Sequence, residues 1–131
     1  RTFFEEWPDP LISGISWVDE LVEIAGGRPL FPELRRGRLA KDRIVAPEQV
    51  AALDPEVIIA SWCGKAVKKR TIVERPGWNE TAAVRNGQVY EVKSTYILQP
   101  GPASLTEGVR QLHECIAQAA LLQAGVKSSA V

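Results

Sequence analysis

The sequence predicts an α/β domain in which a small, mainly parallel sheet lies between helices. Segments typical of strands alternate along the chain with segments typical of helices, as parallel strands with helical crossovers require. The run EVIIA at 56–60 is short, apolar and rich in β-branched residues, like a strand buried on both faces. We expect it to form the centre of the sheet, in a chain whose 131 residues suffice for one core.

The first half of the chain supplies one strand and two helices. We expect the first strand at 2–6, followed by a rigid loop that carries Trp7 and two prolines. Ser16 is a suitable N-cap for a helix that the glycines at 26–27 end. Residues 44–45 are expected to be briefly extended, and Pro47 is expected to begin a helix that stops at residues 54–55.

The second half continues the alternation and ends in a long helix. A helix through 66–73 is expected to break at residues 76–77, and a short helical piece at 81–84 precedes the turn Asn86-Gly87 and a strand at 88–92. Ser104 and Glu107 have the spacing of a capping box. One buried stripe then follows, made of Leu105, Val109, Leu112, Ile116, Ala119 and Gln123. We expect this helix to be the longest, the domain to span 1–124, and the tail 125–131 to fray.

Charge and hydropathy exclude several partners. The 16 Lys and Arg residues balance 16 Asp and Glu residues, so nothing favours non-specific binding to nucleic acid or to an anionic membrane. The basic stretch at 65–70 is expected to be a solvated helix face. No apolar run reaches the roughly 20 residues that a membrane-spanning helix needs.

The residue patterns do not favour an enzyme. The chain has none of the usual motifs for dinucleotides, nucleoside triphosphates or zinc, and adjacent Glu5 and Glu6 point to opposite faces of a strand. Cys63 follows the central strand, but a Cys/His pair with His113 lacks a third, orienting group. Cys115 is expected in the core, and whether the two cysteines pair is left open. We expect a non-enzymatic protein without a cofactor.

Three aromatic residues follow three of the predicted strands: Trp7, Trp62 and Tyr96. The carboxyl ends of parallel strands meet at one edge of a sheet, where α/β proteins bind ligands. A single aromatic residue there is commonly part of the core, but three favour a flat apolar ligand or a partner surface. Trp17 and Trp78 are interpreted as packing anchors.

A set of segments carries a family resemblance. They are EWPDPL at 6–11, SGISWV at 13–18, AGG at 25–27, VAPEQV at 45–50, DPEVII at 54–59, RPGW at 75–78, AVRNGQVY at 83–90 and QPGP at 99–102. In this order they resemble the C-terminal lobe of the ABC-transporter substrate-binding proteins for cobalamin and ferric siderophores. The resemblance covers nearly the whole chain, and its opening segment is most similar to the cobalamin-binding branch.

This resemblance implies a two-lobed protein that is periplasmic or otherwise extracytoplasmic, with a lipid anchor as one option for its full length. A corrinoid or iron chelate would be held between lobes that one long rigid helix joins. The present chain, which starts directly in a strand, would be the C-terminal lobe without the N-terminal one. Trp7, Trp62 and Tyr96 would face the ligand, and Glu48 would dock onto arginines of the membrane permease. Glu48 also lies in the first turn of a helix, where the helix dipole favours a carboxylate whatever its function.

Two alternatives of other classes stay open. The chain could be a corrinoid- or tetrapyrrole-processing enzyme on a similar α/β lobe, with Cys63 or His113 as ligand or nucleophile. It could also be a free-standing module that dimerises through the face that the missing lobe would cover.

Overall fold

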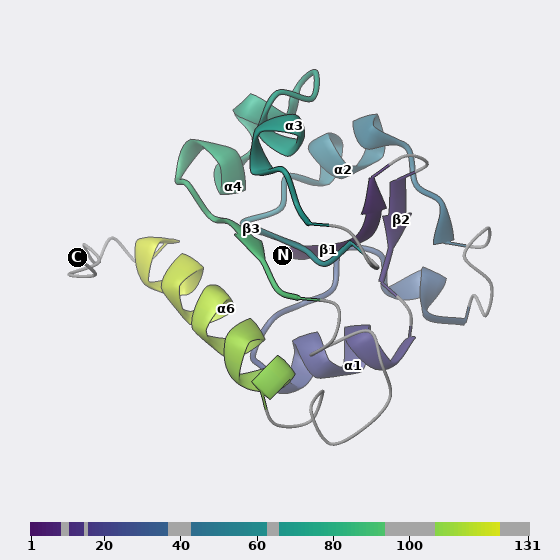
Figure 1. The fold of residues 1–131 in the computed structure, drawn as a ribbon, viewed down its shortest axis with the longest axis vertical. Coiled ribbons are helices and arrows are strands. Elements are labelled where there is room, and N and C mark those ends of the chain that lie inside the picture. The colour runs from purple at the N-terminus through teal and green to yellow at the C-terminus, as the bar shows by residue number, and fades with distance from the viewer. Residues whose placement is uncertain (9–10, 15, 37–42, 63–65, 94–106, 124–131) are drawn as a thin grey trace.

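A four-stranded sheet forms the centre of the computed structural model, which describes residues 1–8, 11–14, 16–36, 43–62, 66–93 and 107–123. The strands are β1 (Thr2–Pro8), β2 (Leu11–Ser13), β3 (Val57–Ala60) and β4 (Val89–Glu91). Their order is β2-β1-β3-β4, with β1, β3 and β4 parallel and β2 antiparallel to β1 (Figure 1). The predicted mainly parallel sheet is therefore confirmed, with β3 between two parallel neighbours.

Strand β2 was not predicted, and the expected loop after the first strand is partly wrong. Strand β1 continues to Pro8, and Pro8 is paired with Leu11 of β2. Prolines favour loops because they lack an amide donor, but Pro8 lies beyond Glu5, the last residue of β1 that is paired with β3, so only β2 is paired with it. All three residues of β2 are buried, and burial of this edge strand outweighs the local signal.

Helices cover both faces of the sheet. One face carries α1 (Ser16–Ile24) and α6 (Val109–Gln123), and the other carries α2 (Pro47–Leu53), α3 (Lys69–Val73) and α4 (Ala82–Arg85), as Figure 1 shows. Two 3-10 turns, η1 (Pro32–Arg36) and η3 (Trp78–Glu80), complete the described elements. The helix expected over 66–73 is shorter than predicted, since its ordered turns begin at Lys69.

The alternation of the strands divides the core into two layers. Phe4 and Ile59 point into the layer under α1 and α6, while Phe3 and Ile58 point into the layer under α2, α3 and α4. The second layer also holds Trp62 and Trp78. Both tryptophans therefore pack on the α2 side of the sheet.

The last helix has the predicted buried stripe. Leu112, Ile116 and Ala119 are buried and Val109 is partly buried against the same core, and α6 is the longest helix of the described residues. Ser104 and Leu105 lie outside the described residues, as do Tyr96 and the tail.

Candidate functional site

Trp7 and Trp62 lie at the same edge of the sheet, as the sequence predicted. Glu5 of β1 is paired with Ala60 of β3, and the Ser61 amide donates to the Glu5 carbonyl at 2.9 Å, so the parallel strands reach the two tryptophans at the same level. Trp7 is half-buried against the core on the α2 side. Tyr96, the third predicted aromatic residue, lies outside the described residues.

Trp62, which the resemblance would have face the ligand, is buried. Only 3% of this residue is exposed, because its ring belongs to the core on the α2 side and its indole Nε1 donates to Glu5 Oε2 at 2.8 Å. Direct contact of Trp62 with a ligand stays a prediction. Of the two described tryptophans at this edge, Trp7 is the one that is partly exposed.

Glu5 is a fully buried carboxylate with three donors around it. Arg75 Nη1 donates to Oε1 at 2.5 Å and Arg75 Nη2 to Oε2 at 2.9 Å, in addition to the Trp62 indole. Taking both charges out of water costs several kcal/mol per ion, which only a well-oriented pair with its remaining hydrogen bonds satisfied offsets. The two-pronged guanidinium contact supplies such an orientation.

Arg75 connects this carboxylate to a second tryptophan. Its guanidinium carbon lies 4.5 Å from the centroid of the Trp78 ring, and this ring packs edge-on against Phe3 at 5.9 Å. The Trp78 indole donates to the Pro47 carbonyl at 3.1 Å. Trp78 is fully buried, so its prediction as a packing anchor is confirmed.

Glu6 points away from Glu5, as expected for neighbours on a strand. It accepts from Arg43 Nη1 at 2.5 Å, and the same nitrogen donates to the Ser13 carbonyl at 2.8 Å. Neither arginine partner, Arg75 or Arg43, was predicted from the sequence. Two adjacent glutamates on a buried strand indicate that each needs a cation, but the sequence does not show which lysine or arginine provides it.

Glu48 is exposed in the first turn of α2, and Pro47 begins this helix as predicted. The amide of Ala46 donates to the side chain of Gln49 at 3.0 Å, which satisfies one backbone donor at the helix start. Glu48 is therefore not needed as the acceptor for the Ala46 amide. Its docking role stays a prediction.

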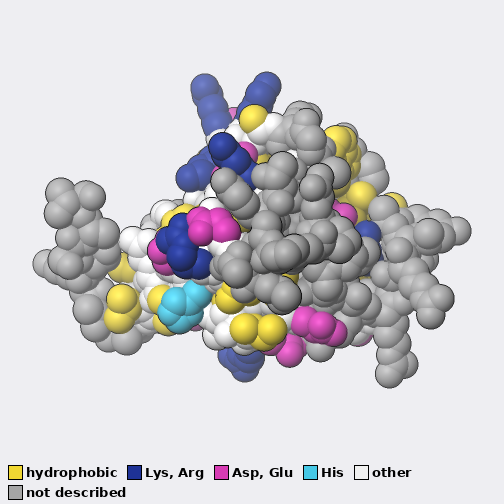
Figure 2. All heavy atoms as spheres, turned by 60° about the horizontal axis from the view of Figure 1, so that its bottom comes forward, with side chains coloured by type: hydrophobic (Ala, Val, Ile, Leu, Met, Phe, Trp, Pro, Cys, Tyr) yellow, Lys and Arg dark blue, Asp and Glu magenta, His cyan; other side chains and the backbone are white. Residues whose placement is uncertain are grey.

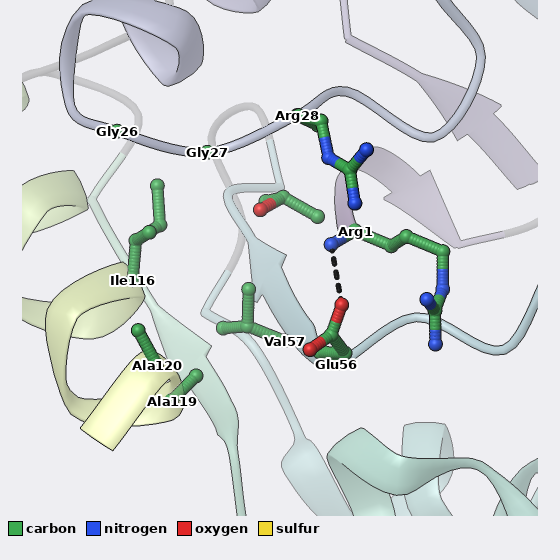
Figure 3. Close-up of a pocket in the computed structure, with 10 residues that line it drawn as sticks. Arg1, Gly26, Gly27, Arg28, Glu56, Val57, Ile116, Ala119 and Ala120 are labelled. Carbon is green, nitrogen blue, oxygen red and sulfur yellow. Dashed lines mark hydrogen bonds and ion pairs between the residues drawn. The ribbon is translucent and has the colours of Figure 1, made fainter. Parts of the chain in front are cut away.

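A small cavity of about 110 Å³ lies at the opposite edge of the sheet (Figure 3). It is lined by Arg1, Thr2, Gly26, Gly27, Arg28, Glu56, Val57, Ile116, Ala119 and Ala120. The backbone nitrogen of Arg1 donates to Glu56 at 2.9 Å. Because the cavity lies at the amino ends of β1 and β3, it is separate from the edge with Trp7 and Trp62.

The residues of the enzyme alternative have ordinary surroundings where they are described. Cys115 is a buried free thiol whose pKa burial raises to about 11, and His113 Nδ1 lies 3.0 Å from the Ala25 carbonyl oxygen. Cys63 lies outside the described residues. Within the described ranges, no three His, Cys, Asp or Glu side chains are grouped to hold a metal ion.

None of the described helices is long and apolar enough to cross a membrane. On the described part of the face in Figure 2, acidic, basic and hydrophobic side chains are interspersed. The predicted solvated face is confirmed for Lys68, Lys69 and Arg70, which are exposed, and Arg70 donates to Glu74 at 2.9 Å.

Comparisons with known proteins point to one family. The family model described as periplasmic binding protein matches residues 2–96. The uncharacterized ABC transporter substrate-binding lipoprotein YvrC of Bacillus subtilis (strain 168) is 35% identical over 69 residues, which are 53% of this chain and 21% of that protein.

Two solved structures share the fold. A candidate iron-binding periplasmic solute-binding protein of Staphylococcus epidermidis ATCC 12228 matches with a TM-score of 0.71 and 20% identity, over 88% of this chain and 44% of that one. The periplasmic vitamin B12 binding protein BtuF of Vibrio cholerae matches with a TM-score of 0.67 and 24% identity, over 91% of this chain and 44% of that one. The chain thus spans less than half the length of either protein.

Proposed function

The chain belongs to the periplasmic binding protein family, and from this we propose that it is the C-terminal lobe of the substrate-binding component of an ABC importer. The observation that supports this most is the uneven coverage of the two solved structures. Each match takes in about nine tenths of this chain, 88% and 91%, but only 44% of the other protein. One lobe of a two-lobed protein would give this result. The segments from EWPDPL at 6–11 to QPGP at 99–102 resemble the C-terminal lobe.

The proposed ligand is cobalamin, a related corrinoid or a ferric siderophore. It would lie at the edge with Trp7 and Trp62, to which residue 96 would add a third aromatic side chain. Rigid aromatic rings cover a large flat ligand at low cost in conformational entropy. Because Trp62 is buried, it would support this surface from below, while Trp7 would touch the ligand.

The proposed partner is the membrane permease. Closure of two lobes around a ligand would present the exposed Glu48 to a basic permease surface, where complementary charge increases the rate of association. The protein would act outside the cytoplasm, consistent with the lipoprotein to which the chain is similar.

A binding experiment tests this proposal on a two-lobed protein that carries this lobe. Cyanocobalamin, haemin and a ferric hydroxamate are titrated separately while tryptophan fluorescence is followed. We expect cyanocobalamin or the ferric hydroxamate to quench the fluorescence saturably, and Trp7→Ala to weaken that binding while the fold is retained. Trp17→Phe, another tryptophan variant, serves as the matched control.

Two results would contradict the proposal. Binding of haemin alone, or of none of the three compounds, would remove the ligand assignment. Chemical conversion of a bound corrinoid that Cys63→Ala abolishes would favour the enzyme alternative.

A further inference from the structure

A continuous series of buried and partly buried contacts joins the proposed ligand edge of the sheet to the start of α2. Trp62 donates to Glu5 at 2.8 Å, and Glu5 accepts both prongs of Arg75 at 2.5 and 2.9 Å. The Arg75 guanidinium lies over Trp78, at 4.5 Å from the ring centroid, and Trp78 donates to the carbonyl of Pro47 at 3.1 Å. Each link is thus a directional contact, and the last of them runs from the Trp78 side chain to the Pro47 backbone.

We propose that Glu5 and Arg75 are positioning residues, which hold the Trp62 indole and the first turn of α2 in a fixed relation. This inference rests on the proposed function, in which Trp62 lies beneath the ligand surface and α2 carries the docking residue Glu48. The ion pair itself touches neither ligand nor permease. The ion pair fixes the relative position of the surface above Trp62, which would touch the ligand, and the surface of α2, which would touch the permease.

Glu5 can hold Trp62 because its carboxylate has no freedom to turn. The side chain is fully buried, and its two oxygens receive three N–H donors. Rotation of the carboxylate would leave a buried charge and a buried indole N–H without partners, which is strongly unfavourable. The Trp62 indole therefore keeps the orientation that Glu5 and Arg75 set.

Arg75 performs two tasks that a lysine does not combine. A guanidinium gives a planar fork to a carboxylate and at the same time lies flat on an aromatic ring, whereas an ammonium is a compact, strongly hydrated charge. The backbone brings Trp78 under Arg75, since the Trp78 amide donates to the Arg75 carbonyl at 3.1 Å and Gly77 between them has φ +82°. The sequence RPGW therefore places the cation and the ring together.

The first arm of the test measures hydrogen exchange of indole N–H groups in the 131-residue chain. Arg75→Lys keeps the positive charge but removes the fork and the ring contact. We expect the exchange of the Trp62 and Trp78 indoles to rise at least tenfold, while the backbone amides of Ile58 and Ile59 exchange as before. Arg70→Lys is the matched control, because Arg70 forms the exposed pair with Glu74.

A purely structural role gives a different pattern. Leu112→Ala opens the core on the other face of the sheet and should raise exchange of indoles and β3 amides together, through global opening. If Arg75→Lys raises the indole exchange only in step with Ile58 and Ile59, or leaves it unchanged, the positioning role is overturned.

The second arm measures association of the two-lobed protein with its permease at low salt. We expect Arg75→Lys to slow association severalfold although Glu48 is intact, and Arg70→Lys to leave it unchanged. Equal association of wild type and Arg75→Lys would overturn the link to α2. A wild type that binds no permease would instead overturn the proposed function, and the indole exchange would still decide whether Glu5 and Arg75 position Trp62.

Discussion

Gly27 lies against Thr2 so closely that a Cβ atom at position 27 would be 2.7 Å from Thr2 Oγ1. The same atom would be 2.8 Å from Ile116 Cδ1 on α6. The turn after α1 thus approaches β1 and α6 at once, at the edge of the sheet opposite to Trp7 and Trp62. Only a residue without a side chain fits there unless its neighbours move.

Gly27→Ala is expected to lower the free energy of unfolding by about 1–3 kcal/mol, the usual cost of overpacking. Urea unfolding followed by far-UV circular dichroism measures the change. Thr2→Ala removes the nearest atom. The double variant Thr2→Ala/Gly27→Ala should therefore lose less free energy of unfolding than the two single variants lose together. Strict additivity would mean that Thr2 is not the source of the strain.

Glu5→Ala is expected to cost the fold about 3–5 kcal/mol, because it leaves the guanidinium of Arg75, whose side chain is only 14% exposed, without its counter-charge. The matched control is Glu74→Ala, which removes an ion pair whose side chains are 86% and 61% exposed. That pair should contribute about 0–1 kcal/mol. Chemical denaturation of both variants compares the two losses, and equal losses would show that burial does not strengthen the dependence on Glu5.

The partners of Glu5 and Glu6 mark the limit of what the sequence could predict. Local patterns were sufficient for α6, for the helix start at Pro47 and for the turn at Asn86-Gly87, because the signals lie within the elements themselves. Glu5 and Arg75 are 70 residues apart, and Glu6 and Arg43 are 37 apart. No pattern in a single sequence links such positions.

Strand β2 and the burial of Trp62 escaped prediction for the same reason. The prolines around position 9 give a local signal for a loop, while pairing with β1 and burial make residues 11–13 a strand. Trp62 follows a buried strand at the kind of edge where α/β proteins bind ligands, but core packing and a hydrogen bond to Glu5, 57 residues away, hold its indole inward.

Acid is expected to weaken the start of α6 through Glu107. Hydrogen bonds from Arg110 and Gln111 lower the pKa of Glu107 to about 2. Since this value lies below the ordinary 4.5, the interaction stabilises the folded state above about pH 4.5 and is lost as the pH falls toward 2. Glu107→Gln should therefore be less stable than wild type at pH 6 and equal to it near pH 2.

The NMR resonance of the Glu107 carboxyl, followed from pH 6 to 2, measures its pKa. Urea unfolding over the same pH range measures the difference in stability between wild type and Glu107→Gln. Because the group is on the surface, 1 M salt should reduce the difference between wild type and Glu107→Gln at pH 6. A midpoint for Glu107 near 4.5 would contradict the assignment of these hydrogen bonds.

Cys115 is expected to resist alkylation in the folded chain. Burial raises the pKa of its thiol to about 11, with a further contribution from the nearby Glu114, so little thiolate exists at pH 8. In a Cys63→Ser background, iodoacetamide should label the chain slowly in buffer and rapidly in concentrated urea. Labelling at the same rate in both conditions would mean that the core between α6, α1 and the sheet does not bury this thiol.

Glu48→Ala separates a docking residue from a residue that only favours its helix. If Glu48 acts only on the helix dipole, the change should cost the fold about 0.3–1 kcal/mol and leave permease association unchanged. We expect instead that ligand affinity of the two-lobed protein is retained while association with the permease slows. The slowing should be largest at low salt, because screening weakens charge steering.

The control for this experiment is Glu20→Ala, which removes an exposed carboxylate from α1 on the other face of the sheet. Both variants change the net charge equally, so a general charge effect would slow both. Slower association of Glu48→Ala alone assigns the effect to the α2 surface. Unchanged association of Glu48→Ala at low salt would exclude the docking role, because a carboxylate that meets a permease arginine cannot be removed without loss of that attraction.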